Sequence, residues 1–131
     1  MTLPDSRAQA VRRRVRAAAK DVYAELGWGY REDVYREALA RELAPLSVAC
    51  EVAMPVLYKG APLSHVSVRW DMLVENLVLV ELKATKTKLG IAALRQCHRY
   101  NQGKHYLCLA INFPDRPGAC LECAPTDTAE A

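Results

Sequence analysis

The spacing of apolar residues at the start of the chain predicts two helices. Asp5 or Ser6 can cap a helix that begins near residue 6, and Gly27 ends it. Its apolar positions recur every three or four residues: Val11, Val15, Ala18, Ala19, Val22 and Leu26. A second helix is predicted over residues 31–44, and Pro45 stops it. We therefore expect two amphipathic helices, each burying one side.

Beyond Pro45 the pattern changes to that of a sheet. Apolar runs bounded by turn residues predict three strands, over residues 47–58, 64–74 and 77–84. A helix is predicted over 87–102, and a last strand over 105–113. Pro55 marks a sheet edge or a bulge. Strands 77–84 and 105–113 contain no proline and are expected in the middle of the sheet. The helix between them should cross one face, as a connection between parallel strands requires.

The predicted element order is α-α-β-β-β-α-β. The chain has 131 residues, which suffices for one domain with its own core. We expect a single α/β domain over residues 1–131, with a central mixed sheet flanked by helices. Residues 124–131 are expected to be a frayed tail.

Three charged residues interrupt two strands that should be apolar: Asp71, Glu81 and Lys83. Side chains two residues apart on a strand share a face, so Glu81 and Lys83 project together. A three-residue loop over 75–77 would put Asp71 opposite Glu81. A two-residue loop would put Asp71 opposite Val80 and place the two carboxylates on opposite faces. The chemistry of the three charges therefore depends on the register of this hairpin.

Two carboxylates held close together repel each other unless a cation or a proton lies between them. Oxygen ligands from Asp71 and Glu81 suit Mg²⁺, which keeps several waters and is completed by substrate phosphate. A lysine beside such a site, here Lys83, can orient or deprotonate a water. The three residues therefore form a minimal phosphodiesterase centre. The alternative is a salt bridge between Glu81 and Lys83 at a sheet edge, with Asp71 at a strand end.

The charge distribution favours a polyanionic partner. The formal net charge is +3, and no carboxylate occurs between Glu81 and Asp115. Six basic residues fall in that interval: Lys83, Lys86, Lys88, Arg95, Arg99 and Lys104. A basic region that follows a strand bearing carboxylates suits a nucleic acid. A solvated basic face that binds nothing is the alternative.

Composition excludes several other classes of protein. No apolar run approaches the roughly 20 residues that span a bilayer, and no signal peptide is visible at the N-terminus. The five cysteines are Cys50, Cys97, Cys108, Cys120 and Cys123. Their odd number and the missing secretory signal favour reduced thiols and a cytoplasmic location. Cys120 and Cys123 form a lone C-x-x-C, which without a second close pair is a weak indication of a metal site.

The order of short motifs along the chain resembles a known family. The pattern Asp71…Glu81-x-Lys83 in a hairpin followed by a helix resembles the PD-(D/E)XK nuclease superfamily. The stretch "GYREDVY" at 29–35 resembles the G-x-x-E-x-x-Y signature of the GxxExxY family, a branch of that superfamily. Further matches follow in order: "EAL" at 37–39, "PVLYKG" at 55–60, "WDMLVEN" at 70–76, "VELKA" at 80–84, "RQCHRYN" at 95–101 and "AINF" at 110–113. The resemblance covers roughly residues 10–113.

The resemblance implies a restriction-endonuclease-like core and a role for each matched residue. Asp71 and Glu81 would be metal ligands, with the Leu82 backbone carbonyl as a third. Lys83 would serve the attacking water, and Gln96 and Glu32 would lie near the centre. The candidate contacts to nucleic acid are four residues of the basic interval, together with Tyr100, for which the resemblance implies such a contact: Lys86, Lys88, Arg95, Arg99 and Tyr100. Of these, Lys86, Lys88 and Arg95 depart from the usual family pattern, which affects expectations about the substrate rather than the centre.

The implied activity is hydrolysis of phosphodiester bonds in DNA, with Mg²⁺ or Mn²⁺ as the cofactor. The alternative is a module that keeps the nuclease fold without catalysis and binds nucleic acid or another protein. No membrane partner is expected. A homodimer or a larger complex stays open.

Overall fold

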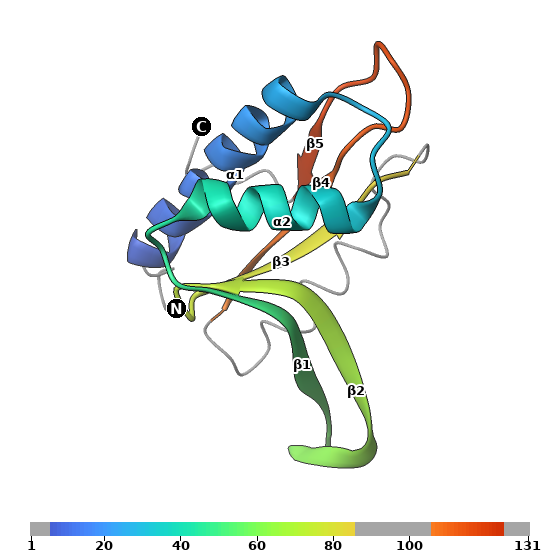
Figure 1. Cartoon of the computed structure of the whole chain (residues 1–131). Helices are drawn as coiled ribbons and strands as arrows, with labels where there is room; N and C mark the ends of the chain where they lie inside the picture. The colour runs from blue at the N-terminus through green and yellow to red at the C-terminus, as the bar shows by residue number, and fades with distance from the viewer. Residues whose placement is uncertain (1–5, 86–105, 125–131) are drawn as a thin grey trace.

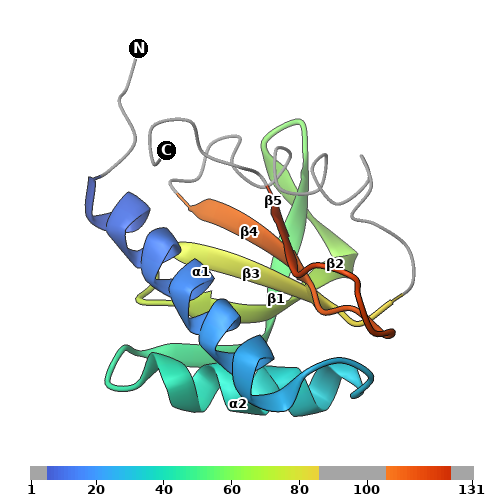
Figure 2. The ribbon, with the colours of Figure 1, turned by 90° about the horizontal axis from the view of Figure 1, so that it is seen from above.

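The computed structural model describes residues 6–85 and 106–124, and within them two helices lie on one face of a five-stranded sheet (Figure 1). The helices are α1 (Ser6–Leu26) and α2 (Glu32–Leu43). The strands are β1 (Val48–Tyr58), β2 (Ala61–Val74), β3 (Val78–Lys83), β4 (Leu107–Asn112) and β5 (Glu122–Ala124). Seen from above, α1 crosses in front of the ends of β3 and β4, and α2 lies along the lower side of the view (Figure 2). The predicted helices and the four predicted strands within the described residues are confirmed, with ends shifted by up to three residues.

The sheet is mixed, as the sequence predicts. Its strand order is β1-β2-β3-β4-β5. Only β3 and β4 run parallel, with Val78 opposite Leu107 and Lys83 opposite Asn112, while the other neighbours are antiparallel. Both strands are therefore internal, which confirms the expectation for 77–84 and 105–113. The helix predicted over 87–102 lies outside the described residues.

The core is divided by the sheet into two layers. The larger layer lies between the helices and the sheet and contains the apolar side of α1 together with Tyr35, Leu39 and Leu43 of α2. The smaller layer lies on the other face: Met54, Trp70, Leu79 and Cys108. Strand β4 is buried on both faces, because Cys108 belongs to one layer and Leu109 to the other. A strand with so continuous an apolar sequence needs cover on both sides.

The hairpin of β1 and β2 bends away from the helices (Figure 1). Two irregularities lie in β1. Glu51 has a φ of 55° and is skipped in the pairing between Cys50 and Val52. The register then shifts between Pro55 and Leu57. The bulge expected at Pro55 is thus confirmed, and β1 is also the edge strand of the sheet.

Strand β5 corrects the sequence-based picture. The sequence predicts no strand after residue 113 and a frayed tail over 124–131, yet Glu122–Ala124 pairs with β4 in the antiparallel direction. Ala124 therefore belongs to the sheet and not to a frayed tail. A strand of three residues next to glycine and prolines has too short a pattern to be recognised in a sequence. Within the described part of the chain, no helix is long and apolar enough to cross a membrane.

Candidate active site

The turn between β2 and β3 sets the register on which the candidate chemistry depends. Val74 pairs with Val78, so the turn holds three residues, 75–77. The Leu77 N–H donates to the Val74 carbonyl at 2.9 Å, and Glu75 and Asn76 both have positive φ. Positive φ at both central positions is typical of tight hairpin turns. The register expected for a three-residue turn is confirmed, and continuing it past the last pair places Asp71 opposite Glu81.

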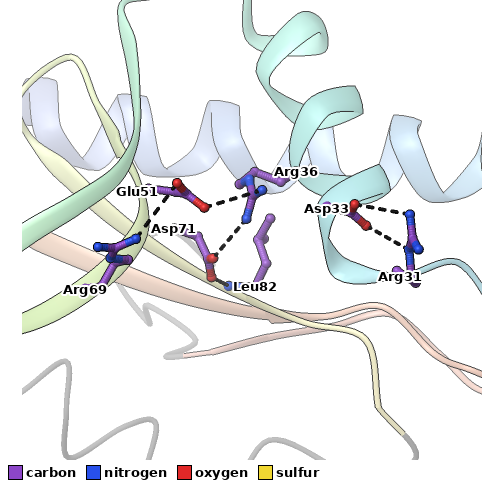
Figure 3. Close-up of polar contacts among 7 residues, drawn as sticks. All are labelled: Arg31, Asp33, Arg36, Glu51, Arg69, Asp71 and Leu82. Carbon is purple, nitrogen blue, oxygen red and sulfur yellow. Dashed lines mark hydrogen bonds and ion pairs between the residues drawn. The ribbon is translucent and has the colours of Figure 1, made fainter.

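The hydrogen-bonded pairing of β2 with β3 ends next to Asp71, the first residue of the candidate site. Met72 with Val80 is its last pair. The Leu82 N–H, next in line for a ladder bond, donates instead to Asp71 Oδ2 at 2.6 Å (Figure 3). The Lys83 carbonyl accepts a hydrogen bond from Phe113 N, so it points towards β4. Because the backbone groups of successive residues in a strand point to opposite sides, those of Leu82 point towards β2. The Leu82 carbonyl therefore points to the side on which Asp71 lies.

Glu81 is a carboxyl group held in a site that disfavours its charge. Its side chain is 15% exposed. Burial, a side-chain hydrogen bond with Asp71 and the charge of Asp71 together raise the pKa of Glu81 to about 8. The charge of Lys83 and the backbone N–H of Asp71 oppose that rise. Two carboxyl groups in contact in a half-buried place share a proton or attract a cation.

Lys83 lies beside this pair at the end of β3. Its Nζ is 3.9 Å from Glu81 Oε2, and 45% of its side chain is exposed. Its backbone is held by the bond from Phe113 N at 2.8 Å. The ammonium group is therefore near the acid pair but still open to solvent. Asp71, Glu81 and Lys83, which are ten and two residues apart in sequence, are thus brought together.

Asn112 was missed by the sequence reasoning and fixes the chain just after Lys83. It is 3% exposed. Its Oδ1 accepts from the Thr85 backbone N–H at 3.1 Å, and its Nδ2 donates to the Thr85 carbonyl at 3.3 Å. Nδ2 also lies 3.4 Å from Glu122 Oε1 on β5. The motif "AINF" contained this residue, but nothing in the sequence tied it to the end of β3.

Arg36 is a second functional residue that the sequence reasoning missed. From α2 its guanidinium reaches Asp71 Oδ1 and Glu51 Oε1, each at 3.7 Å (Figure 3). Glu51 also pairs with Arg69 at 3.9 Å. Glu51 faces Asp71 across β1 and β2, between the pairs on either side of it. A row of three carboxylates thus crosses three strands, with Arg36 above it as a counter-charge.

The G-x-x-E-x-x-Y stretch has a structural explanation for two of its three residues. Gly29 has a φ of 95°, and its N–H donates to the Pro114 carbonyl at 3.2 Å. The Tyr35 hydroxyl donates to the Gly27 carbonyl at 2.6 Å, and its ring stacks on Phe113 at 4.1 Å. Burial raises the pKa of Tyr35, which suits a core phenol that stays protonated.

Glu32, the third residue of that stretch, begins α2 and is half-buried. Among the described residues, no hydrogen bond or ion pair joins it to Lys83 or to Asp71. Arg36, one turn further along the same helix, reaches the site instead. The other predicted site residues lie outside the described residues: Lys86, Lys88, Arg95, Gln96, Arg99 and Tyr100.

Of the C-x-x-C pair, Cys123 lies in the edge strand β5, which β4 separates from Glu81 in β3. Cys120 is exposed, and Cys123 lies in β5 with a pKa raised by burial. A raised thiol pKa disfavours the thiolate that zinc requires. No group of three or more histidine, cysteine or carboxylate side chains suited to a metal ion occurs in residues 6–85 and 106–124.

Comparison with known families adds an independent line of evidence. A family model described as the PD-(D/E)XK nuclease superfamily matches residues 9–120. No curated protein and no solved structure matches the chain significantly. The mixed five-stranded sheet with its two helices agrees with the restriction-endonuclease-like core that the motifs implied. The matched range includes every residue of the candidate site.

Proposed function

The chain belongs to the PD-(D/E)XK nuclease superfamily, and from this premise we propose that it hydrolyses phosphodiester bonds of DNA with Mg²⁺ or Mn²⁺ as cofactor. Membership supports a function of the nuclease type and interaction with nucleic acid. Such nucleases generally use divalent metal ions. The choice of DNA, the metal and the role of each residue are the further content of the proposal.

One observation carries the proposal. Asp71 and Glu81 are in contact at the end of the β2–β3 ladder, and Lys83 Nζ lies 3.9 Å from Glu81. This is the acid, acid and lysine set that metal-assisted phosphodiester hydrolysis needs, placed at one point by the register of the hairpin. An ordinary salt bridge at a sheet edge would not explain a second carboxyl group in contact with Glu81.

The donor set fits a hard divalent cation. Both side chains offer oxygen. Burial, together with the hydrogen bond and the charge of Asp71, raises the pKa of Glu81 to about 8, although Lys83 lies nearby. Asp71, Glu81 and the Leu82 carbonyl would hold the ion, and water and substrate would complete its shell. When bound, such an ion lowers the pKa of a water and stabilises charge on the phosphate.

The protein's own residues divide the remaining tasks. Lys83 would orient the attacking water, or accept its proton once the lysine has first released a proton of its own and become a neutral amine. Arg36 balances the charge of Asp71 and Glu51 from α2. Asn112 keeps the chain beyond Lys83 in place through Thr85.

Finer assignments belong to the same proposal. The stretch 29–35 supports the GxxExxY branch of the superfamily. Gln96 and Glu32 are assigned supporting roles near the centre, and residues 1–131 are assigned to one nuclease-like domain. The contacts to nucleic acid are assigned to Lys86, Lys88, Arg95, Arg99 and Tyr100. Tyr100 would contact a base or a phosphate.

The test is cleavage of single- and double-stranded DNA by purified protein with Mg²⁺, with Mn²⁺ and with chelator. Asp71→Asn is the informative variant, because the amide oxygen still accepts the Leu82 N–H while the charge is lost. We expect metal-dependent cleavage by the wild type and a loss of at least about 10²-fold in the variant. Glu37→Gln, an exposed acid on α2, is the matched control.

Absence of cleavage, or cleavage that Asp71→Asn leaves unchanged, would overturn the proposal. Salt-dependent DNA binding without cleavage and without metal binding would favour a non-catalytic module with the nuclease fold. In that case Arg36 would serve as the permanent counter-charge of Asp71.

A further inference from the structure

The outer part of the β1–β2 hairpin, residues 52–70, projects from the body of the protein (Figure 1). We call this segment the arm. Its strands pair with each other, and its tip is the turn at Lys59 and Gly60, both with positive φ. The arm begins beside the row formed by Glu51 and Asp71, so its base lies at the candidate active site.

The arm leaves large apolar side chains in solvent. The exposed fractions are Leu57 46%, Tyr58 60%, Leu63 42% and Val66 53%. These four belong to the six large apolar residues that are exposed in the described part of the chain. A two-stranded ribbon is marginally stable in water on its own, and several large apolar side chains exposed on one short ribbon indicate a binding surface. The arm is therefore expected to have a partner.

The charge of the arm indicates which partner. Residues 52–70 contain no Asp or Glu, while Lys59, His65 and Arg69 lie there. At the tip, Lys59 Nζ lies 5.5 Å from the centre of the Tyr58 ring. A basic residue beside an exposed aromatic ring suits phosphates and stacked bases. Two such arms from two copies of the chain would carry charges of the same sign, which disfavours their pairing.

The dimensions of the arm suit a duplex. A two-stranded ribbon fits the major groove of B-DNA, which is about 12 Å wide. From Glu51 to Lys59 the strand extends at most about 26 Å at about 3.3 Å per residue. That length corresponds to about seven or eight base pairs of duplex, given one pair of phosphates per about 3.4 Å.

We infer that the arm is a DNA-binding element that lies in a groove of the duplex, while the acid pair at its base faces the scissile phosphate. This inference rests on the proposed function for the nature of the ligand. It adds residues of β1 and β2 to the candidate contacts with nucleic acid.

The experiment separates binding from cleavage. Fluorescence anisotropy with a labelled duplex of about 20 base pairs, in chelator, measures binding by the wild type and by Tyr58→Ala/Lys59→Ala. Lys20→Ala is the charge-matched control, because Lys20 is exposed and lies near Cys123 at the far edge of the sheet. We expect about tenfold weaker binding and a smaller salt dependence for the double variant alone.

Steady-state cleavage then gives a second readout. The double variant should raise KM about tenfold with kcat within about twofold, because the arm binds substrate without touching the reacting atoms. If the double variant binds DNA as tightly as the wild type and has the same KM, the arm does not bind DNA. That result would not contradict the proposed nuclease function. Weaker binding by that variant, with no cleavage by any form, would support the arm and overturn the nuclease function.

Two further outcomes would also contradict the proposal that the arm binds DNA. One is a wild-type protein that does not bind duplex DNA at low salt. The other is a wild-type dimer in sedimentation that Tyr58→Ala/Lys59→Ala converts to a monomer with unchanged DNA affinity. That result would make the arm a contact between copies of the chain. Circular dichroism of the variants establishes that the changes leave the fold intact.

Discussion

Lys83 is nearly half exposed and lies 3.9 Å from Glu81, so its ion pair alone contributes about 0 to 1 kcal/mol. We expect Lys83→Ala to leave the thermal midpoint almost unchanged. If Lys83 serves the attacking water, the same variant should cleave about 10² to 10⁴-fold more slowly in single-turnover experiments. Lys83→Arg should not rescue the rate, because a guanidinium does not give up its proton. A wild-type rate in Lys83→Ala would reduce this residue to a surface ion pair.

Glu81 predicts a pH dependence of stability in metal-free protein. Its folded pKa of about 8 lies above its ordinary value of 4.5, so the folded state binds more protons between these values. Stability from this group is therefore fully present below about pH 4.5 and is lost as the pH rises towards 8. Thermal midpoints in chelator should fall with pH across this window in the wild type.

Glu81→Gln is the control for that measurement, since its amide does not titrate. Its midpoint should change less with pH than that of the wild type in the same window. Mg²⁺ should flatten the wild-type curve, because a cation replaces the shared proton and stabilises the folded state by mass action. Parallel curves for the two proteins would contradict the raised pKa.

Arg36 predicts opposite changes in stability and in metal affinity. Its guanidinium lies 3.7 Å from Asp71 Oδ1, where a positive charge offsets the acid pair in the absence of metal. Arg36→Gln should lower the metal-free thermal midpoint. It should also tighten Mn²⁺ binding by calorimetry about three- to tenfold, since one repulsive positive charge is gone. Arg41→Gln, which removes an exposed charge on the same helix, should change neither.

Weaker or unchanged Mn²⁺ binding by Arg36→Gln would show another role for Arg36. It would then hold Asp71 in place rather than compete with the ion. The two roles differ in kinetics as well, because a misplaced Asp71 would lower kcat at saturating metal.

Among the elements, α2 is attached in part through the buried phenol of Tyr35. Tyr35 stacks on Phe113 of the β4 end, while its hydroxyl accepts from Tyr30 N at 3.2 Å and donates to the Gly27 carbonyl. Tyr35→Phe keeps the stacking and leaves a backbone carbonyl unsatisfied. We expect a loss of about 1 to 3 kcal/mol in the free energy of unfolding, measured with urea.

Tyr23→Phe is the matched control for that change. The Tyr23 hydroxyl donates to the Ala119 carbonyl at a longer distance, 3.2 Å, in a partly buried place. Removal of the Tyr23 hydroxyl should lower the free energy of unfolding by less than removal of the Tyr35 hydroxyl. Equal costs for the two variants would mean that the Tyr35 hydroxyl adds little to the position of α2.

For the molecule as a whole, the sequence was sufficient to predict the elements that a periodic apolar pattern determines. The apolar spacing predicted α1 and α2. For the hairpin, the sequence offered a two-residue and a three-residue turn, and the structure shows the three-residue turn that places Asp71 opposite Glu81. The residues that it missed act through contacts between distant segments. Arg36 reaches β2 from α2, and Asn112 reaches the chain after β3 from β4. The left-handed backbone of Glu51 leaves no mark in a sequence, because that residue type does not favour it.

The bond from the Leu82 N–H to Asp71 has a consequence for how this protein changes over evolutionary time. Asp71 satisfies the Leu82 N–H where the β2–β3 ladder ends, in addition to its proposed role at the metal, so we expect selection for a stable fold to retain it even where activity is lost. Lys83 has no comparable structural role among the described residues, since its side chain lies 3.9 Å from Glu81 and is 45% exposed. In descendants that have become inactive, we expect the lysine to drift first, while aspartate or asparagine persists at position 71. An acid at position 71 would then indicate only common descent, and a lysine at position 83 would be the better indicator of an active enzyme.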